Sequence, residues 1–278
     1  MSSGGLTDAE RELRERQGAG ARYDAANAPH ADLALARRGT AYFARKLNEL
    51  SDAELDEPSL LPGWTRRHVV AHVGYNARAL THLTEWARTG VETPMYPSPD
   101  ARERQMARGV TLPARALRHL FEHAAVHLTV EWRDLGDEQW DVQVRTAQGR
   151  TVPVRETAWM RGREVWVHAV DLGNDGSFLD FPPEFVDRLI ADVFGAWARR
   201  GESVDLVIVL RDRPRASDAE PVELRDGPNQ TDAGTIVLGA GGPTVTGSAA
   251  DVARWLTGRG ARRLESSVGA LPEIPRWF

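Results

Sequence analysis

The chain has 278 residues and a mass of 30.7 kDa, which is large for one domain and favours two. Hydrophobic residues make up 41% and charged residues 27%, values that are typical of globular proteins and exclude a disordered or fibrous chain. The net charge of −5 offers no basic face, so we expect no nucleic-acid partner. The sequence has neither a run of about 18 apolar residues nor an apolar core in its first segment, MSSGGLTDAERELRERQ, which predicts a cytoplasmic protein without a membrane partner.

Cysteine is absent from the sequence, and this is the most restrictive feature of the composition. Its absence excludes disulfides, CxxC redox chemistry, thiolate metal sites and a cysteine nucleophile. Any thiol chemistry therefore needs a thiol from outside the chain. Eight histidines remain as the main resource for metal binding and acid–base chemistry.

Four helices are predicted before residue 175, because apolar residues recur there at three- and four-residue steps between helix boundaries. They span residues 31–50, 66–89, 113–135 and 157–172. Residues 1–30 lack a sustained apolar stripe, so we exclude this N-terminal extension from the core. Three prolines predict a loop at 92–100, and the alternating run at 141–154 predicts two short strands.

The pattern changes after residue 175, where helices and strands alternate. Helices are predicted at 182–200 and 248–259, the second capped by Ser248, and strands at 203–212, 221–227 and 235–241. The glycine-rich stretch 239–243 lacks the spacing of a phosphate-binding loop and predicts a turn. We therefore predict an α+β protein, with the extension at 1–30, a metal-binding four-helix bundle at 31–175 and a smaller α/β domain at 176–278.

Glu164 and His168 are candidate metal ligands. They stand four residues apart on a predicted helix, so both side chains lie on one face and can bind the same ion. Such a pair taken alone is more often a surface salt bridge. Met160, Val167 and Asp171 share the stripe, which favours a pair that faces the bundle interior, where an unpaired charge would be costly.

A third ligand is expected from His68 or His72, which are also four residues apart, and the spacing does not choose between them. Two histidines and one carboxylate leave an open position on zinc, as catalytic sites do. A rival site is the histidine ladder, defined as His119, His123 and His127. We disfavour it because three histidines from one helix form a poor tetrahedral cage.

Arg259, in the string LTGRG, is the basic residue of most interest after the last helix. Its position alone favours a simple interpretation, in which the charge lies at a helix C-terminus and interacts with the helix dipole.

Four strings closely resemble the mycothiol-dependent maleylpyruvate isomerase family, and the likeness extends from about Ala31 to Phe278. They are LLPGWTRRHVVAHVGYNARAL, EWARTGVETPMYPSPDAR, TAQGRTVPVRETAWMRGREVWVHAVDLG and the ending GRG to SSVGALPEIPRWF. The resemblance implies a DinB-like four-helix bundle followed by a smaller α/β domain similar to sterol-carrier folds. It also implies metal ligands at His72, Glu164 and His168 and a catalytic arginine at Arg259.

The same resemblance implies two cofactors, mycothiol and Zn²⁺ or another divalent metal, and a small dicarboxylate substrate. The implied reaction is the cis–trans isomerisation of maleylpyruvate to fumarylpyruvate in gentisate degradation. Such an isomerisation needs a nucleophile that adds to the double bond, permits rotation and leaves, and a thiolate can do this. We expect a monomer.

Two alternative functions stay open. The first is a mycothiol S-transferase on the same scaffold, which would add the thiol to an electrophile and never eliminate it. The second is a non-enzymatic protein that binds a metal or an apolar ligand.

Overall fold

The computed structural model describes residues 23–213 and 234–277. The α-helices are α2 (His30–Asn48), α3 (Arg66–Thr89), α4 (Pro99–Val110), α5 (Ala114–Asp134), α6 (Glu156–Asp171), α7 (Pro183–Arg199) and α8 (Ala249–Leu256). The short 3₁₀ helices are η1 (Ala53–Asp56), η2 (Asp137–Asp141) and η3 (Phe178–Asp180). The strands are β1 (Gln143–Arg145), β2 (Thr151–Pro153), β3 (Leu206–Leu210), β4 (Thr235–Leu238), β5 (Thr244–Gly247) and β6 (Glu265–Ser266). This combination confirms the predicted α+β class.

The contacts between Cα atoms divide the chain into two compact units. The first unit combines the described residues up to Thr40 with Arg67–Glu164, and the second combines Ala41–Arg66 with the described residues from Val165 onward. The borders fall inside α2 and α6 and after the first residue of α3, so these three helices contribute residues to both units. The domain borders predicted after residues 30 and 175 stay a prediction.

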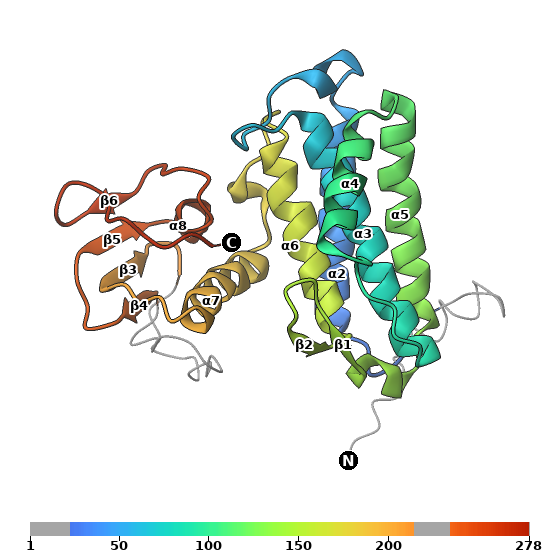
Figure 1. Ribbon diagram of the computed structural model, residues 1–278. Helices are drawn as coiled ribbons and strands as arrows, with labels where there is room; N and C mark the ends of the chain where they lie inside the picture. The colour runs from blue at the N-terminus through green and yellow to red at the C-terminus, as the bar shows by residue number, and fades with distance from the viewer. Residues whose placement is uncertain (1–22, 214–233, 278) are drawn as a thin grey trace, which may run out of the picture. The chain divides into compact units, whose positions relative to one another are not determined.

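Four helices of the first unit share one apolar core, which confirms the predicted bundle. Figure 1 shows α2, α3, α5 and α6 running side by side. The core includes Leu33, Leu80, Leu83, Leu128, Trp132 and Ala158. Trp132 on α5 donates its indole N–H to the Thr157 hydroxyl on α6 at 3.0 Å, so the bundle is joined by a buried polar contact as well.

The N-terminal extension is not wholly outside this core. Ala28 is buried in it, so the exclusion of residues 1–30 is wrong at that position. The Asn27 backbone N–H donates to Asp137 Oδ1 at 2.8 Å, and Arg37 pairs with Asp24 at 2.6 Å. These contacts hold the residues just before α2 against the bundle. Residues 1–22 of the extension lie outside the described part of the chain.

Among the described residues before 175, helix α4 is a fifth α-helix, and the sequence pattern does not predict it. Ser98 caps it by accepting a hydrogen bond from the Ala101 backbone N–H at 3.2 Å, and a proline occupies the first turn. The predicted loop at 92–100 is therefore wrong at its last two residues, which are helical. A Cβ at Gly109 would meet the Tyr75 ring at 2.7 Å and the Ala71 Cβ at 2.8 Å, so only glycine lets α4 lie this close to α3.

The second unit contains a four-stranded mixed sheet in the order β4-β3-β5-β6. Strand β3 is antiparallel to β4 and parallel to β5, and β6 is antiparallel to β5. Helix α7 packs against α8, and α8 packs against β5. Alternate residues of β3 are buried, which places this strand at the core of the unit: Leu206, Ile208 and Leu210.

The strand predictions for this unit are confirmed in part. Strand β4 ends at Leu238, earlier than predicted, because Gly239 and Gly241 adopt positive φ values of 60° and 77° and turn the chain toward β5. The predicted turn at 239–243 is therefore present, whereas β5 and β6 were not predicted. The strand predicted at 221–227 lies outside the described residues. The likeness to sterol-carrier folds stays a prediction.

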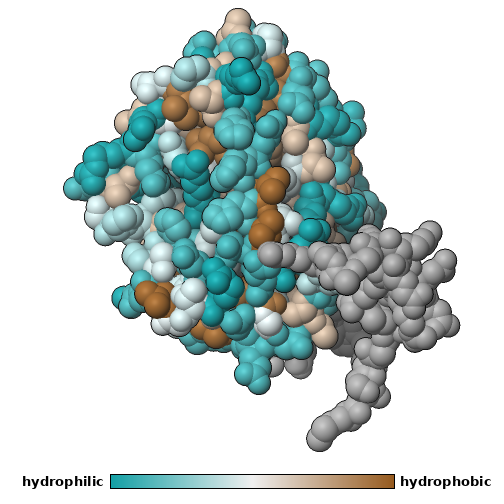
Figure 2. Space-filling model, turned by 90° about the vertical axis from the view of Figure 1, so that its right-hand side faces the viewer, coloured by the Kyte–Doolittle hydropathy of each residue, from teal (hydrophilic) through white to brown (hydrophobic). Residues whose placement is uncertain are grey.

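The surface shows no large apolar area on the face drawn in Figure 2, where hydrophobic residues form small patches among hydrophilic ones. The large hydrophobic side chains that are exposed are far apart in the sequence: Leu60, Val91, Val126, Leu179 and Val268. In the described ranges, no helix combines the length and the hydropathy needed to cross a bilayer.

Candidate metal centre

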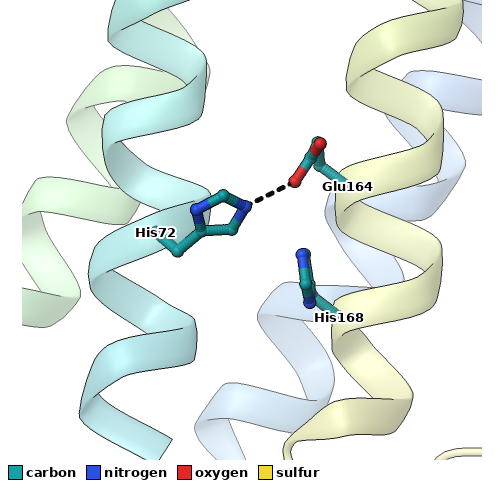
Figure 3. Close-up of side chains that lie close together, drawn as sticks. All are labelled: His72, Glu164 and His168. Carbon is teal, nitrogen blue, oxygen red and sulfur yellow. Dashed lines mark hydrogen bonds and ion pairs between the residues drawn. The ribbon is translucent and has the colours of Figure 1, made fainter. Parts of the chain in front are cut away.

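Helices α3 and α6 bring three candidate ligands together (Figure 3). His72 lies on α3, and Glu164 and His168 lie one turn apart on α6. One nitrogen or oxygen atom of each side chain lies within 4.8 Å of those of the other two. His72 Nε2 is 2.7 Å from Glu164 Oε2. The three side chains are 14–23% exposed, so they are partly desolvated but still reachable.

The chemistry of this donor set fits a divalent metal ion. Two imidazoles and one carboxylate suit zinc and similar ions, and three protein ligands leave a position open. Between residues 23 and 213 and between 234 and 277, this is the one group of three such side chains close enough to hold an ion. The group contains His72 and not His68, which lies one turn earlier on α3.

The histidine ladder follows the exposed face of α5. The ring centroids of His119 and His123 are 5.8 Å apart, and those of His123 and His127 are 6.1 Å apart. His127 lies 3.6 Å from Glu131 one turn later. The three imidazoles do not converge on one point, as expected for histidines on a solvated helix face.

A buried carboxylate, Asp171, lies directly behind His168. The His168 Nδ1 atom is 2.8 Å from Asp171 Oδ2, and the Asp171 side chain is fully buried. Arg259 donates to the same carboxylate with two nitrogens, from Nε to Oδ1 at 3.1 Å and from Nη2 to Oδ2 at 2.8 Å. We define these three residues, His168, Asp171 and Arg259, as the Asp171 network. Burial raises the pKa of Asp171, but the hydrogen bonds from His168 and Arg259 outweigh it and lower the pKa to about 2.

Two glycines shape the backbone that carries Arg259. Gly258 and Gly260 have φ values of 78° and 83°, a region that other residues rarely adopt. The Arg259 backbone N–H donates to the Arg254 carbonyl at 3.0 Å, and its Nη1 donates to the Thr257 carbonyl at 2.6 Å. The string LTGRG is therefore a helix end built to fold the arginine side chain back toward Asp171. The sequence-based interpretation of a simple helix-end charge misses this second partner.

The C-terminal end of α6 is anchored by the segment before α3. The Leu60 backbone N–H donates to the Asp171 carbonyl at 2.9 Å. The buried Arg66 guanidinium donates to the Leu172 carbonyl at 2.7 Å and pairs with Glu57 at 2.8 Å. Helix carbonyls at this end have no partner inside the helix, so these bonds satisfy them and fix the last turn of α6.

A second arginine, Arg161, is buried beneath Glu164 on the preceding turn of α6. Its side chain is 1% exposed, and its Nη1 donates to the Val73 carbonyl at 2.6 Å and to Asn76 Oδ1 at 3.0 Å. Burial lowers the pKa of Arg161 to about 10, and the nearby Glu164 opposes this effect. Because Val73 follows His72 on α3, this guanidinium joins the two helices next to the candidate ligands.

Comparisons with known proteins identify the family to which the chain belongs. The profile of the mycothiol maleylpyruvate isomerase N-terminal domain matches residues 36–173, and that of the MDMPI C-terminal domain matches residues 180–276. A crystal structure of the mycothiol-dependent maleylpyruvate isomerase matches with 43% identity over 89% of this chain and 96% of that chain, at a TM-score of 0.78. A structure of a histidine-to-alanine mutant of that isomerase matches to the same extent. Among curated sequences, no protein matches.

The chain belongs to the mycothiol-dependent maleylpyruvate isomerase family. This membership confirms the resemblance found in the sequence and the expected enzyme class, an isomerase. YfiT from Bacillus subtilis, described as a probable metal-dependent hydrolase with an unusual four-helix bundle topology, also matches, with 15% identity over 62% of this chain and 91% of that chain. The TM-score of this match is 0.41, so we draw no conclusion about this chain from it.

Four site residues are predicted from the sequence, but the groups that support them are not. Asp171 shares the stripe of Glu164 and His168, and an acidic residue three positions after a histidine on a helix is a usable signal for a contact between the two. No comparable signal exists for Arg161, because its partners Val73 and Asn76 lie on another helix and carry no distinctive pattern.

Proposed function

We propose that this protein is a mycothiol-dependent maleylpyruvate isomerase that converts maleylpyruvate to fumarylpyruvate in gentisate degradation. The observation that carries the proposal is the convergence of His72, Glu164 and His168 in a chain 43% identical to an isomerase of that description. We expect the protein to act as a cytoplasmic monomer.

The composition of the chain supports a bound thiol as the nucleophile, because the sequence has no cysteine. The thiolate sulfur of mycothiol would add to the alkene carbon β to the ketone, and the electron pair of the double bond would move to the ketone oxygen to form an enolate. The former double bond is then single and can rotate. Collapse of the enolate restores the ketone and a trans double bond and expels the thiolate, so no thiol is consumed.

The residues proposed to hold the metal, His72, Glu164 and His168, fit zinc or another divalent ion with a free coordination position. A bound divalent ion supplies Lewis acidity, which lowers the pKa of a thiol placed against it. The role of the chain is to fix the three ligands in a partly desolvated position where such an ion acts strongly.

Arg259 is the proposed catalytic residue. The substrate carries two carboxylates and gains an enolate during the reaction, so a guanidinium can stabilise the developing negative charge. Among the described residues, Asp171 and Thr257 accept hydrogen bonds from three of its five N–H groups, and we propose that the other two bind the anionic substrate.

The test is an assay of the purified full-length protein with maleylpyruvate, with and without mycothiol. We expect turnover only with mycothiol, and we expect the thiol concentration to stay constant while many equivalents of product form. Isomerisation in thiol-free buffer would contradict the proposal. Loss of one thiol per product would indicate an S-transferase, and binding without turnover would indicate a non-enzymatic metal- or ligand-binding protein.

A further inference from the structure

We propose that Asp171 is a positioning residue that orients two groups at once, the metal ligand His168 and the catalytic guanidinium of Arg259. This inference rests on the proposed function and adds a residue to it. Asp171 itself touches neither ion nor substrate in this proposal. It acts only through the hydrogen bonds of the Asp171 network.

The first effect of Asp171 is on the tautomer and rotation of His168. A carboxylate can only accept hydrogen bonds, so the 2.8 Å contact places the imidazole hydrogen on Nδ1. The lone pair is then on Nε2, which is the nitrogen proposed to bind the ion. The same bond fixes the ring plane, because the carboxylate is buried and its helix turn is anchored by Leu60. Groups of this kind behind metal-binding histidines commonly change metal affinity 10–100-fold.

The second effect is on Arg259. The two nearly parallel bonds to Oδ1 and Oδ2 hold the guanidinium in one plane, as a fork on a carboxylate does. An arginine side chain has several rotatable bonds, and the Arg259 backbone lies between two glycines with positive φ. The bond from Nη1 to the Thr257 carbonyl is one restraint on the side chain, and the fork on Asp171 adds two more, so that the guanidinium is held in one orientation.

The location of Asp171 argues against a role in folding alone. A carboxylate in the last turn of α6 is unfavourable for the helix dipole, and full burial adds a desolvation penalty. Replacing both partners of a buried ion pair by apolar residues is often neutral for stability, whereas removing only one partner is costly. Stability alone therefore does not require an ion pair at this position. Asp171 contacts a candidate metal ligand, His168, on one side and the candidate catalytic Arg259 on the other. The orientation of these two groups accounts for a carboxylate at this buried position.

The first experiment measures Zn²⁺ affinity by chelator competition and records the visible absorption of the Co²⁺-loaded protein, using the full chain. We expect Asp171→Asn to weaken Zn²⁺ binding 10–100-fold and to shift the Co²⁺ bands. The amide has one acceptor oxygen in place of two and no charge, and it can present its NH₂ group to Nδ1, so it no longer fixes the tautomer of the imidazole. Asp180→Asn is the control for the change of a hydrogen-bonded carboxylate to an amide. Asp180 accepts a 2.6 Å hydrogen bond from Tyr42 in the same unit, but it is exposed and does not contact His168. This variant should leave affinity and bands unchanged. Asp171→Glu, which keeps the charge but displaces the carboxylate, is the second variant and should shift the bands in the same direction.

The second experiment combines Asp171→Asn with Arg259→Ala and measures kcat/KM at saturating metal. If Asp171 holds the guanidinium in place, Arg259→Ala should lower kcat/KM about 100-fold in the wild type but only a few-fold in the Asp171→Asn background. An equal loss in both backgrounds would overturn this part of the inference.

The inference and the proposed function fail in different ways. His168→Ala is the reference variant, and its metal affinity should fall below that of Asp171→Asn. If His168→Ala binds Zn²⁺ as tightly as the wild type, the proposed metal site is wrong. If His168→Ala loses the metal while Asp171→Asn and Asp171→Glu keep wild-type affinity and Co²⁺ bands, the metal site stands and the positioning role of Asp171 is refuted.

Discussion

The buried carboxylate of Asp171 predicts how the stability of the metal-free protein depends on acid. Its pKa falls from an ordinary value of 3.8 to about 2 in the folded protein. Because each pKa unit corresponds to about 1.4 kcal/mol, the ionised carboxylate stabilises the fold by about 2–3 kcal/mol relative to its protonated form. Asp171→Asn carries a neutral group of similar shape at all pH values and should lose this contribution at neutral pH.

The sign of the effect follows from the lowered pKa. The unfolded chain binds the proton more readily than the folded one, so the contribution is fully present above the unfolded pKa of 3.8 and disappears as the pH falls through about 2. At pH 3 about half remains, which is a loss of roughly 1 kcal/mol between pH 5 and pH 3. The wild type and Asp171→Asn should therefore become more alike in stability as the solution becomes more acidic.

The assay is urea unfolding of both metal-free proteins at pH 7, 5 and 3, with the two free energies compared at each pH. Other carboxylates titrate in both proteins, so their effects cancel in the difference. We expect the wild type to be more stable by about 2–3 kcal/mol at pH 7 and pH 5, and by about 1 kcal/mol at pH 3. A difference that stays constant over this range would show that Asp171 is not held ionised by His168 and Arg259, and the reasoning would be wrong.

Three further predictions test the packing and the charges around the candidate site. Gly109→Ala should lower the unfolding free energy by about 1–3 kcal/mol, because the new Cβ would overlap Ala71 and Tyr75. Gly195→Ala is the control: its Cβ meets only the end of the Arg199 side chain at 3.1 Å, so it should be neutral or stabilising by up to about 1 kcal/mol. Equal effects of the two variants in urea unfolding would contradict this. Replacing His119, His123 and His127 by glutamine should leave the metal content of purified protein unchanged, and metal loss would move the site to α5. Arg161→Met should lower stability by no more than about 2 kcal/mol, since two lost hydrogen bonds are offset by removal of a buried charge; a larger loss in urea unfolding would show that the guanidinium makes stronger interactions.

The helical half of the fold could be predicted because its signals are local. The stretches that form α3, α5 and α6 carry apolar residues at helical steps. Prolines before their first residues and glycines after their last residues mark the helix boundaries in the sequence. Glu164 and His168 could be predicted in the same way, because residues four positions apart on one helix lie on the same face, one turn apart. Only the third ligand, on another helix, needed the family resemblance or the structure.

Helix α4 shows where local signals end. Its sequence, PDARERQMARGV, has few apolar residues, so helical periodicity could not reveal it. Ser98 caps the helix in the structure, but the prolines around that residue favour a loop in the sequence. Gly109 lets α4 approach Ala71 and Tyr75 of α3 closely, and such packing between two helices cannot be recognised from the sequence of α4 alone. Strand β5 escaped prediction for a similar reason, because its four residues pair with β3, more than 30 positions earlier.

Arg259 is the residue for which position in the sequence was most misleading. Next to the end of α8 it resembles a charge that interacts with a helix dipole, and its bond to the Thr257 carbonyl fits that interpretation. Its main partner, however, is Asp171, 88 positions earlier. Charge balance predicts a partner for Asp171. A buried acidic residue beside a metal ligand needs a cation to offset its charge. An arginine suits this role because it can donate two hydrogen bonds to one carboxylate. An arginine held between two glycines can supply such a fork.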